Sequence, residues 1–334
     1  MIAVKSNTKN KPCCFFYVSS KLNAGGGHIA RSLSLAAELS DEFEILFIPD
    51  TNNNYKFLSK IKNNKFGLTT LYSDEQLVKS IIIVDSYNVS NSELIKLKDF
   101  YGTLVCMDDF GNSPDIVDIS INISSLNNKI SKVKGKLIVQ GIKYALLSSE
   151  YSNYEVPVTS KIVDTILISF GLFDSKGFSV KILDTLQEFG YRSKVIVALS
   201  SQALSTKLIK ENINKYTFDI DIVEDEDGLY SLMNKSDVII GSGGVNLLER
   251  MALGKPSISI PVSSNQEQQI ELTNLVGATF AVSDNLHDIN IGLEHILNNY
   301  KEREKMSKSA RYLVDGNGAK RVALAIIDRQ KNIE

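Results

Sequence analysis

A chain of 334 residues with 43% hydrophobic content is long enough for two packed cores. Its 37 lysine and arginine residues nearly balance 39 acidic ones, so the net charge of -2 excludes the broad basic surface of proteins that bind nucleic acid or anionic lipid. Cys13, Cys14 and Cys106 have neither metal-ligand spacing nor an even count, and no apolar run approaches the roughly 20 residues of a membrane span. We expect a cytoplasmic protein with no nucleic-acid partner and no membrane insertion. The sequence leaves its oligomeric state open.

Short apolar runs alternate with segments of helical period in the first half of the chain, which is typical of strand–helix units around a parallel sheet. We expect strands over residues 15–18, 43–48, 80–84, 103–107, 119–121 and 137–138. We expect helices over residues 27–39, 54–61, 74–77 and 92–101.

The pattern lapses over residues 148–161, SSEYSNYEVPVTSK, and then restarts. This indicates an N-terminal Rossmann-like domain over 1–155, a second over 156–310, and a C-terminal helix within 311–334 that we leave free to cross back to the first domain. In the second half we expect strands over 165–170, 193–198, 217–223, 238–241 and 257–261, helices over 177–190, 205–212, 229–235 and 246–253, and three more helices over 288–330.

The segment AGGGHIARSLSLAAEL links a strand-like run to a helix through Gly25, Gly26 and Gly27. Three glycines let a ligand approach backbone N–H groups, and a helix start adds unpaired donors and partial positive charge. The spacing is neither that of a dinucleotide fingerprint nor that of a P-loop, and a purely structural loop is an alternative. The turn is a candidate site for a diphosphate or a sugar.

His28 lies in the first turn of that helix, and Arg31 falls three residues later on the same face. A neutral imidazole can take a proton near pH 7, so His28 is a candidate general base, with a turn-capping surface histidine as the alternative. Arg31 either orients the loop, meets an anion or makes a surface salt bridge.

A second glycine turn, in IIGSGGVNLLERMALG, follows an apolar strand and opens a helix, and it too can cradle phosphate. Glu249 could bind ribose hydroxyls with both carboxylate oxygens. Other strand ends, where open α/β sheets place ligands, carry polar groups that could instead close turns. The candidate residues at these places are Ser242, Gly243, Gly244, Val245 and Asn246 with Glu249, then Asp85 and Tyr87, Phe170, Gly171 and Asp174, and Asn265 and Gln266.

The acidic runs MDDF and VEDEDG raise the possibility of Mg²⁺. They are better explained as a strand-end turn and a solvated helix entry, so we expect no metal and no cofactor.

Several blocks together resemble a known family: FFYVSSKLNAGGGHIAR, VDSYN, MDDFGNSPDIVD, ILISFGLFD, GSGGVNLLERMALGKPSISIPVSSNQEQQ and VDGNGAKRVALAI. The chain resembles the UDP-sugar hydrolases of pseudaminic acid biosynthesis, which release UDP from UDP-2,4-diacetamido-2,4,6-trideoxy-β-L-altropyranose. These are similar in fold to GT-B glycosyltransferases. The resemblance implies two Rossmann-like domains whose parallel sheets face a central cleft.

By that resemblance His28 activates water, Tyr87 contacts the sugar or assists, residues 242–246 with Glu249 bind UDP, and Asn265 and Gln266 face the sugar and diphosphate. The chain departs from the family pattern at Val18, at 30–32, near 121–123, at Ser148 and at 171–174. These departures fall on sugar-facing loops, so the nucleotide is better defined than the sugar.

The sequence thus predicts metal-independent hydrolysis of a UDP-linked acetamido-deoxy sugar in surface-glycan biosynthesis, with His28 as base and inversion at the anomeric carbon. The alternatives are an inverting GT-B glycosyltransferase that uses a UDP-sugar donor, and a non-catalytic nucleotide-sugar sensor.

Overall fold

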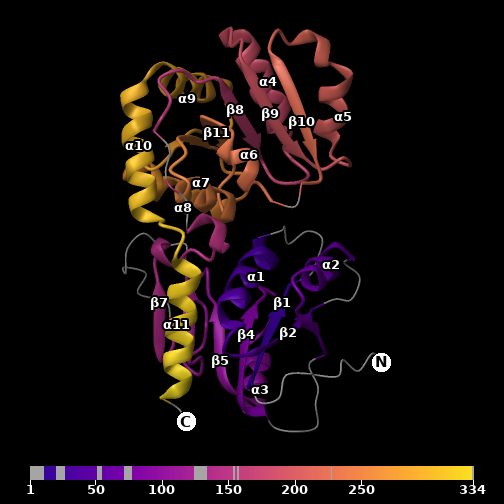
Figure 1. Cartoon of the computed structure of the whole chain (residues 1–334), viewed down its shortest axis with the longest axis vertical. Coiled ribbons are helices and arrows are strands. Elements are labelled where there is room, and N and C mark those ends of the chain that lie inside the picture. The colour runs from indigo at the N-terminus through magenta and orange to yellow at the C-terminus, as the bar shows by residue number, and fades with distance from the viewer. Residues whose placement is uncertain are drawn as a thin grey trace. The chain divides into compact units, whose positions relative to one another are not determined.

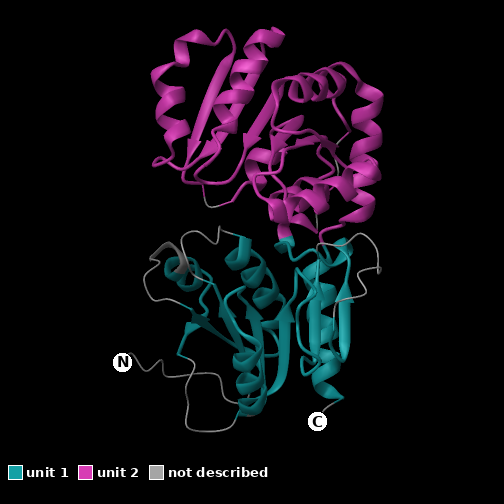
Figure 2. Ribbon diagram, turned by 180° about the vertical axis from the view of Figure 1, so that it is seen from behind, with its two compact units in different colours: residues 1–149, 317–334 teal, residues 150–316 magenta. Residues whose placement is uncertain are grey.

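The computed structural model describes residues 11–19, 27–50, 55–70, 77–123, 134–152, 155, 158–226 and 228–332. The chain divides into two compact units, which we call unit 1 (residues 1–149 and 317–334) and unit 2 (residues 150–316), as coloured in Figure 2. The expected divisions, after residues 155 and 310, lie a few residues away from these. The C-terminal segment from Asn317 onward belongs to unit 1.

Unit 1 contains a parallel sheet of seven strands in the order β3-β2-β1-β4-β5-β6-β7 (Figure 1). Its long apolar strands lie at the centre, where Phe16, Ile82 and Leu104 are fully buried. Helix α11 packs against α1. The elements are β1 (Cys13–Val18), α1 (Gly27–Leu39), β2 (Glu44–Pro49), α2 (Tyr55–Asn63), β3 (Gly67–Leu68), β4 (Leu77–Asp85), α3 (Asn91–Phe100), β5 (Tyr101–Met107), β6 (Ile119–Asn122), β7 (Leu137–Gln140) and α11 (Gly318–Lys331).

Unit 2 contains a second parallel sheet, of six strands in the order β10-β9-β8-β11-β12-β13. Its core gathers strand residues such as Ile168 and Ile240 with helix residues such as Ile182 and Leu293. The elements are β8 (Thr165–Ser169), α4 (Phe178–Phe189), β9 (Lys194–Leu199), α5 (Leu204–Glu211), β10 (Asp219–Glu224), α6 (Tyr230–Asn234), β11 (Val238–Gly241), α7 (Val245–Ala252), β12 (Ser257–Ser259), α8 (Ser264–Leu275), β13 (Phe280–Ala281), α9 (Leu286–Asn298) and α10 (Tyr300–Leu313).

The predicted fold class, two α/β domains with parallel sheets, is confirmed, and most expected elements lie within a few residues of the observed ones. Two predictions are wrong. The helix expected over 74–77 is excluded at Leu77, which begins β4, while 74–76 lie outside the described residues. The segment SSNQEQQ, expected as a loop, forms the first turns of α8. Its buried face contains Gln269 and Thr273 beside Ile270, so it has no apolar period to signal a helix.

The strand order places the first and fourth strands of each sheet side by side. In unit 1 Val18 of β1 lies opposite Asp85 of β4, and in unit 2 Ser169 of β8 lies opposite Gly241 of β11. These are the points where strand order reverses and where open α/β sheets bind ligands beyond the carboxyl ends of their strands. Among the described helices, none is both long and apolar enough to cross a membrane.

Candidate active site

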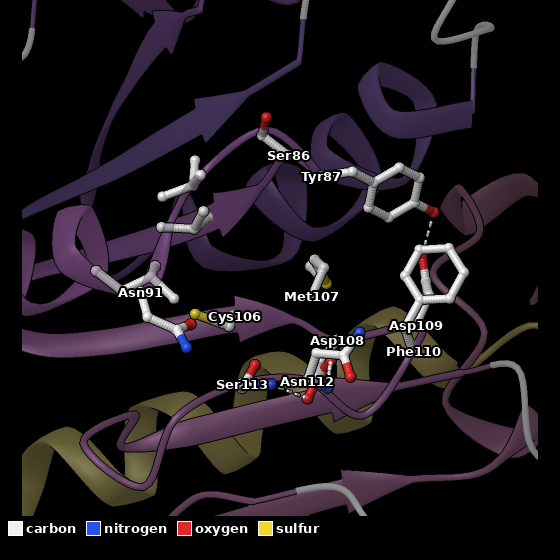
Figure 3. Close-up of a pocket in the computed structure, with 13 residues that line it drawn as sticks. Ser86, Tyr87, Asn91, Cys106, Met107, Asp108, Asp109, Phe110, Asn112 and Ser113 are labelled. Atoms are coloured by element: carbon white, nitrogen blue, oxygen red, sulfur yellow. Dashed lines mark hydrogen bonds between the residues drawn. The ribbon is translucent and has the colours of Figure 1, made fainter.

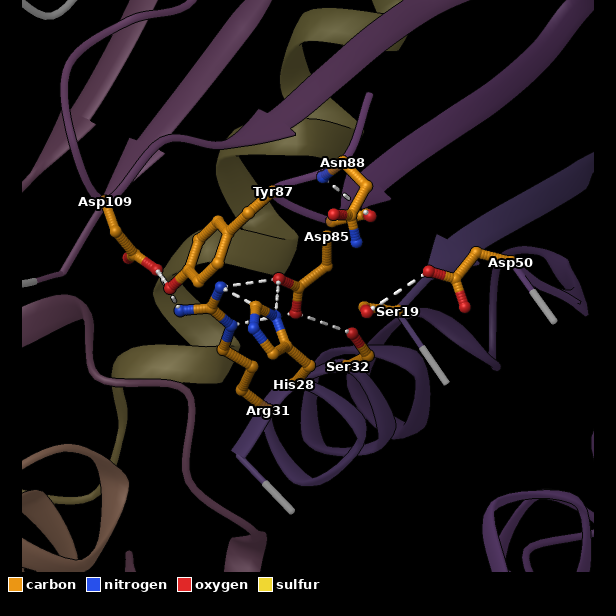
Figure 4. A network of polar contacts seen from close by, with 10 residues as sticks. Ser19, His28, Arg31, Ser32, Asp50, Asp85, Tyr87, Asn88 and Asp109 are labelled. Atoms are coloured by element: carbon orange, nitrogen blue, oxygen red, sulfur yellow. Dashed lines mark hydrogen bonds and ion pairs between the residues drawn. The ribbon is translucent and has the colours of Figure 1, made fainter. Parts of the chain in front are cut away.

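His28 and Asp85 form a buried pair at the reversal point of unit 1. Helix α1 begins at Gly27 and carries His28 in its first turn, while Asp85 is the last residue of β4. The His28 Nδ1 and Asp85 Oδ1 atoms lie 2.6 Å apart, and His28 is 6% exposed (Figure 4). A carboxylate is an acceptor, so this contact assigns the ring proton to Nδ1 and leaves the Nε2 lone pair to accept a proton. His28 Nε2 makes no hydrogen bond to any described residue.

Arg31 completes the environment of the carboxylate. Its Nε and Nη2 donate to the two Asp85 oxygens at 2.8 and 2.5 Å, and the Ser32 hydroxyl donates to Asp85 Oδ2 at 3.1 Å. Asp85 therefore has two donors on each oxygen and is fully buried. The sequence placed Asp85 among the residues that contact a ligand, and the structure surrounds both of its oxygens with side chains of α1. Its position is that of a residue that orients the imidazole.

The charges in this cluster stabilise one another. Burial alone would raise the pKa of the Asp85 carboxyl, but the adjacent Arg31 guanidinium and the hydrogen bonds from Arg31 and His28 hold that pKa well below its usual range. Burial likewise opposes the charge on Arg31, while Asp85 and Asp109 raise the pKa of Arg31 above its ordinary value. Asp85 is therefore an anion beside the imidazole at neutral pH.

Tyr87 borders the pair and is half-exposed. Its ring lies edge-on to the His28 ring, with the two ring centroids 4.6 Å apart, and its centroid is 5.0 Å from that of the Phe110 ring. Its hydroxyl donates to Asp109 Oδ2 at 2.6 Å, and Arg31 Nη1 donates to the same oxygen at 2.8 Å. Burial and the neighbouring Asp109 carboxylate raise the pKa of the Tyr87 hydroxyl. Tyr87 is thus a neutral donor held to Asp109, and its ring, 48% exposed, is the part open to a ligand.

A pocket of about 190 Å³ lies at the carboxyl ends of β4 and β5 and includes Tyr87 in its lining (Figure 3). Phe110 is an exposed aromatic wall of this pocket, and Ser86, Asn91 and Asn112 give it a polar rim.

Asp108 beside this pocket closes a turn. It accepts hydrogen bonds from the backbone N–H groups of Asn112 and Ser113 at 2.8 and 3.0 Å. Asp109 is held by Arg31 and Tyr87. In the part of the chain that the structure describes, no group of three or more histidine, cysteine or acidic side chains could hold a metal ion.

The second glycine turn lies at the reversal point of unit 2, between β11 and α7. We call residues 241–244 the glycine loop. Gly244 has a φ of 76°, which favours glycine, and a Cβ on Gly241 would lie 2.4 Å from the Ser169 carbonyl oxygen. The loop leads directly into the first turn of α7, which begins at Val245. Its geometry is that of a strand-to-helix anion site.

Acceptors from α8 occupy the N–H groups of this loop. The side-chain oxygen of Gln266 accepts from Gly243 N at 3.2 Å and from Val262 N at 3.1 Å, and that of Gln269 accepts from Gly244 N at 2.7 Å. Gln266 thus touches the loop predicted to bind a diphosphate. Asn265 is exposed and accepts only from Ser263 among the described contacts.

Asn246 and Glu249 of α7 are each engaged within unit 2. Asn246 Oδ1 accepts from Arg250 at 2.5 Å. Glu249 is half-buried and accepts a hydrogen bond from the hydroxyl of buried Tyr151, whose pKa is raised by burial and by that carboxylate.

The loop after β8 departs from expectation. Phe170 was predicted to contact a ligand, and the structure places its side chain in the core of unit 2, with its ring centroid 5.1 Å from that of Phe178. Strand alternation directs it inward. Gly171 has a φ of 85° and open space beside it, and Asp174 caps α4 by accepting from Phe178 N and Ser179 N at 2.9 Å. Gly25 and Gly26 lie outside the described residues.

Three residues of these sites escaped the sequence analysis: Asp109, Gln269 and Arg250. Asp109 is 78 residues from its partner Arg31, so no local pattern links them. Arg250 lies fully buried under the glycine loop. The signal that could have revealed it was a charged residue between the apolar positions Leu248 and Met251, on the inward side of a helix.

Comparisons with known proteins agree with two such units. Residues 175–324 match the Glycosyltransferase family 28 C-terminal domain. The chain is 26% identical to "Uncharacterized protein MJ1062" of Methanocaldococcus jannaschii over 70% of this chain and 52% of that protein, so it spans about half the length of this relative. It is 21% identical to "Spore coat polysaccharide biosynthesis protein SpsG" of Bacillus subtilis over 91% of this chain and 94% of that protein.

A solved structure, that of MurG from Acinetobacter baumannii, superposes with a TM-score of 0.68 at 11% identity and covers 95% of this chain and 100% of that one. Agreement over both units at this level shows the fold. The chain therefore has a GT-B-like fold of two parallel-sheet α/β units.

Proposed function

We propose that the protein transfers a glycosyl group from a UDP-linked acetamido-deoxy sugar to an acceptor hydroxyl, with His28 as general base. The observation that carries the proposal is the buried pair of His28 and Asp85 at the reversal point of unit 1, with Nδ1 bound to the carboxylate and Nε2 left to take a proton. The match of residues 175–324 to a glycosyltransferase domain supports transfer, and the spore coat polysaccharide relative supports a role in surface-glycan synthesis.

The proposed reaction is a single displacement. His28 Nε2 takes the proton of the acceptor hydroxyl as that oxygen bonds to the anomeric carbon, and the bond from the anomeric carbon to the phosphate oxygen breaks. UDP leaves with the electron pair, and the configuration inverts. Asp85 stabilises the imidazolium that forms, as a carboxylate does in a hydrolase triad. Tyr87 offers its ring to the sugar.

Unit 2 supplies the groups for the nucleotide in this proposal. The N–H groups of Gly243 and Gly244 and the start of α7 would stabilise charge on the departing diphosphate. Glu249, a carboxylate that follows the glycine loop on α7, would accept the ribose hydroxyls. The proposed steps use no metal ion, and of the two neighbouring carboxylates Asp108 closes a turn and Asp109 pairs with Arg31.

Hydrolysis of the same donor is the second candidate, because water can replace the acceptor hydroxyl in front of the same base. The blocks around His28, Tyr87 and the glycine loop resemble the hydrolases of pseudaminic acid biosynthesis, which favours this reaction. The sequence alone ranks hydrolysis first. The matched glycosyltransferase domain reverses that order.

The test is UDP release from a panel of UDP-sugars by the purified full chain, with CDP- and dTDP-sugars as controls, in the presence and absence of acceptor saccharides. Transfer predicts release that depends on acceptor and a glycosylated product of matching mass. Rapid release without acceptor identifies the hydrolase instead. Tight UDP binding with no turnover of any sugar would exclude both reactions and favour a sensor.

A further inference from the structure

Arg250 of α7 is a fully buried guanidinium without a carboxylate partner. Its Nη2 donates to the Ser242 carbonyl oxygen at 2.8 Å and to the Ser259 hydroxyl at 2.9 Å, and its Nη1 donates to Asn246 Oδ1 at 2.5 Å. All three acceptors are neutral, and Arg250 makes no ion pair with any described residue; the charge of the neighbouring Glu249 offsets the effect of burial on its pKa only in part. Its Nε is buried without a hydrogen-bond partner in the same part of the chain. Burial lowers the pKa of Arg250 to about 9, so it remains a cation at neutral pH.

A buried charge of this kind opposes folding unless something compensates it. Arg303, the other large arginine buried in unit 2, donates to the carbonyl oxygens of Ile296 and Leu297 in the last turns of α9, where the helix dipole is negative. Arg250 instead binds Asn246 in the first turn of α7, at the N-terminal end of the helix, which carries the partial positive charge of the helix dipole. Two positive contributions therefore meet at the glycine loop, and an anion there relieves both.

The backbone of the loop is fitted closely to this guanidinium. A Cβ on Gly241 would lie 2.6 Å from Arg250 Nη1, so Gly241 permits the contact. Arg250 binds the Ser242 carbonyl oxygen, which fixes the peptide group that carries the Gly243 N–H and lies next to the one that carries the Gly244 N–H. Those N–H groups are met by the side-chain oxygens of Gln266 and Gln269, neutral acceptors that a phosphate oxygen can replace with a charged one.

We propose that Arg250 is a positioning residue for the diphosphate of the nucleotide: from under the glycine loop it fixes the loop backbone and supplies the positive charge that a bound diphosphate balances. The inference rests on the proposed function, since that function places a nucleoside diphosphate at this loop. Arg250 acts through the loop and does not itself touch the ligand.

The experiment measures the dissociation constants of UDP, uridine and inorganic pyrophosphate by calorimetry for the full chain and for Arg250→Gln and Arg250→Lys. Arg250→Gln should weaken the binding of UDP and of pyrophosphate by about tenfold or more, which is the scale of one charge acting across a few ångströms of protein. It should change uridine affinity less than about twofold, since uridine carries no phosphate. Arg250→Lys keeps the charge and should retain more of the pyrophosphate affinity than Arg250→Gln. The salt dependence of UDP binding should fall in Arg250→Gln.

Arg303→Lys is the matched control, because it alters a buried guanidinium of the same unit away from the loop. It should lower the melting temperature and leave the ratio of UDP to uridine affinity unchanged. A purely structural Arg250 would behave in the same way. If folded Arg250→Gln and Arg250→Lys keep the wild-type ratio of UDP to uridine affinity, this inference is overturned and the proposed function is not. If the wild type binds none of the three probes, the proposed donor site fails and this inference fails with it.

Discussion

Replacing Asp85 by asparagine tests how the base is held. The carboxylate accepts from His28 and Arg31 on one oxygen and from Arg31 and Ser32 on the other. An amide offers one oxygen and one NH₂ group. If the NH₂ faces Arg31 Nε and Ser32, donors oppose donors. If it faces His28 Nδ1, the imidazole must carry its proton on Nε2 and can no longer act as base.

Both orientations predict a large loss. A wrong tautomer or a misaligned ring should lower kcat by about 100-fold to 10,000-fold. Removal of one partner from a buried ion pair should lower the free energy of unfolding by about 3 to 5 kcal/mol, because Arg31 keeps its charge. Steady-state UDP release and urea unfolding measure the two effects on one preparation.

Asp118→Asn is the matched control, since Asp118 is also a buried carboxylate of unit 1, paired with Lys98 and Lys136. It should destabilise the fold and leave kcat within about threefold of the wild type, because it does not touch His28. Folded Asp85→Asn with kcat within threefold of the wild type would refute the reasoning.

The Asp85 pair also sets acid stability. Because the folded pKa of Asp85 lies below its ordinary value of 3.8, the carboxylate contributes stability above about pH 4 that is lost as the pH falls through the folded value. Asp85→Asn should lose less stability than the wild type between pH 4 and more acid conditions.

Three further outcomes are expected. Burial lowers the pKa of Lys255 from 10.5 to about 8, so between these pH values the unfolded chain binds more protons than the folded one. The stability of the wild type should therefore rise from pH 8 to pH 10.5 relative to that of Lys255→Met. Urea midpoints that change in parallel for the two proteins would contradict this. Gly316→Ala should lower the free energy of unfolding by several kcal/mol, because a Cβ there would lie 2.4 Å from the Tyr151 carbonyl oxygen at a φ of 81°. Gly277→Ala, at a φ of 70° but with open space around it, should lower the free energy of unfolding by about 1 kcal/mol. Equal melting points for the two variants would refute the clash. Tyr87→Phe keeps the exposed ring and should hold KM near the wild-type value, while Tyr87→Ala should raise KM several-fold. An equal effect of both substitutions on KM would assign the contact with the sugar to the hydroxyl.

Local patterns in the sequence were sufficient for the longer strands and for α1, while the two-residue strands β3 and β13 were not predicted. The apolar runs that form β1, β4 and β8 become central parallel strands, because a strand buried on both faces needs a continuous apolar stretch. The shared face of His28 and Arg31 follows from helical spacing alone, and in the structure these side chains lie 3.3 Å apart at their nearest nitrogens.

The remaining features depend on contacts that no local pattern records. Asp85 looked available because it ends a strand, but donors that lie more than 50 positions earlier in the chain saturate both of its oxygens. Phe170 directly follows the last residue of β8, and its side chain turns inward. Helix α8 has a largely polar buried face, which is visible only once Gln269 is seen bound to the glycine loop.

The rate of UDP release or transfer by His28→Gln tests the central claim most directly, with His295→Gln, a substitution in unit 2 where the ring stacks on Phe280, as the control. General-base loss predicts that kcat falls by about 100-fold or more in His28→Gln while UDP affinity and the melting temperature stay close to those of the control. A folded His28→Gln enzyme that turns over its UDP-sugar at nearly the wild-type rate would contradict the account.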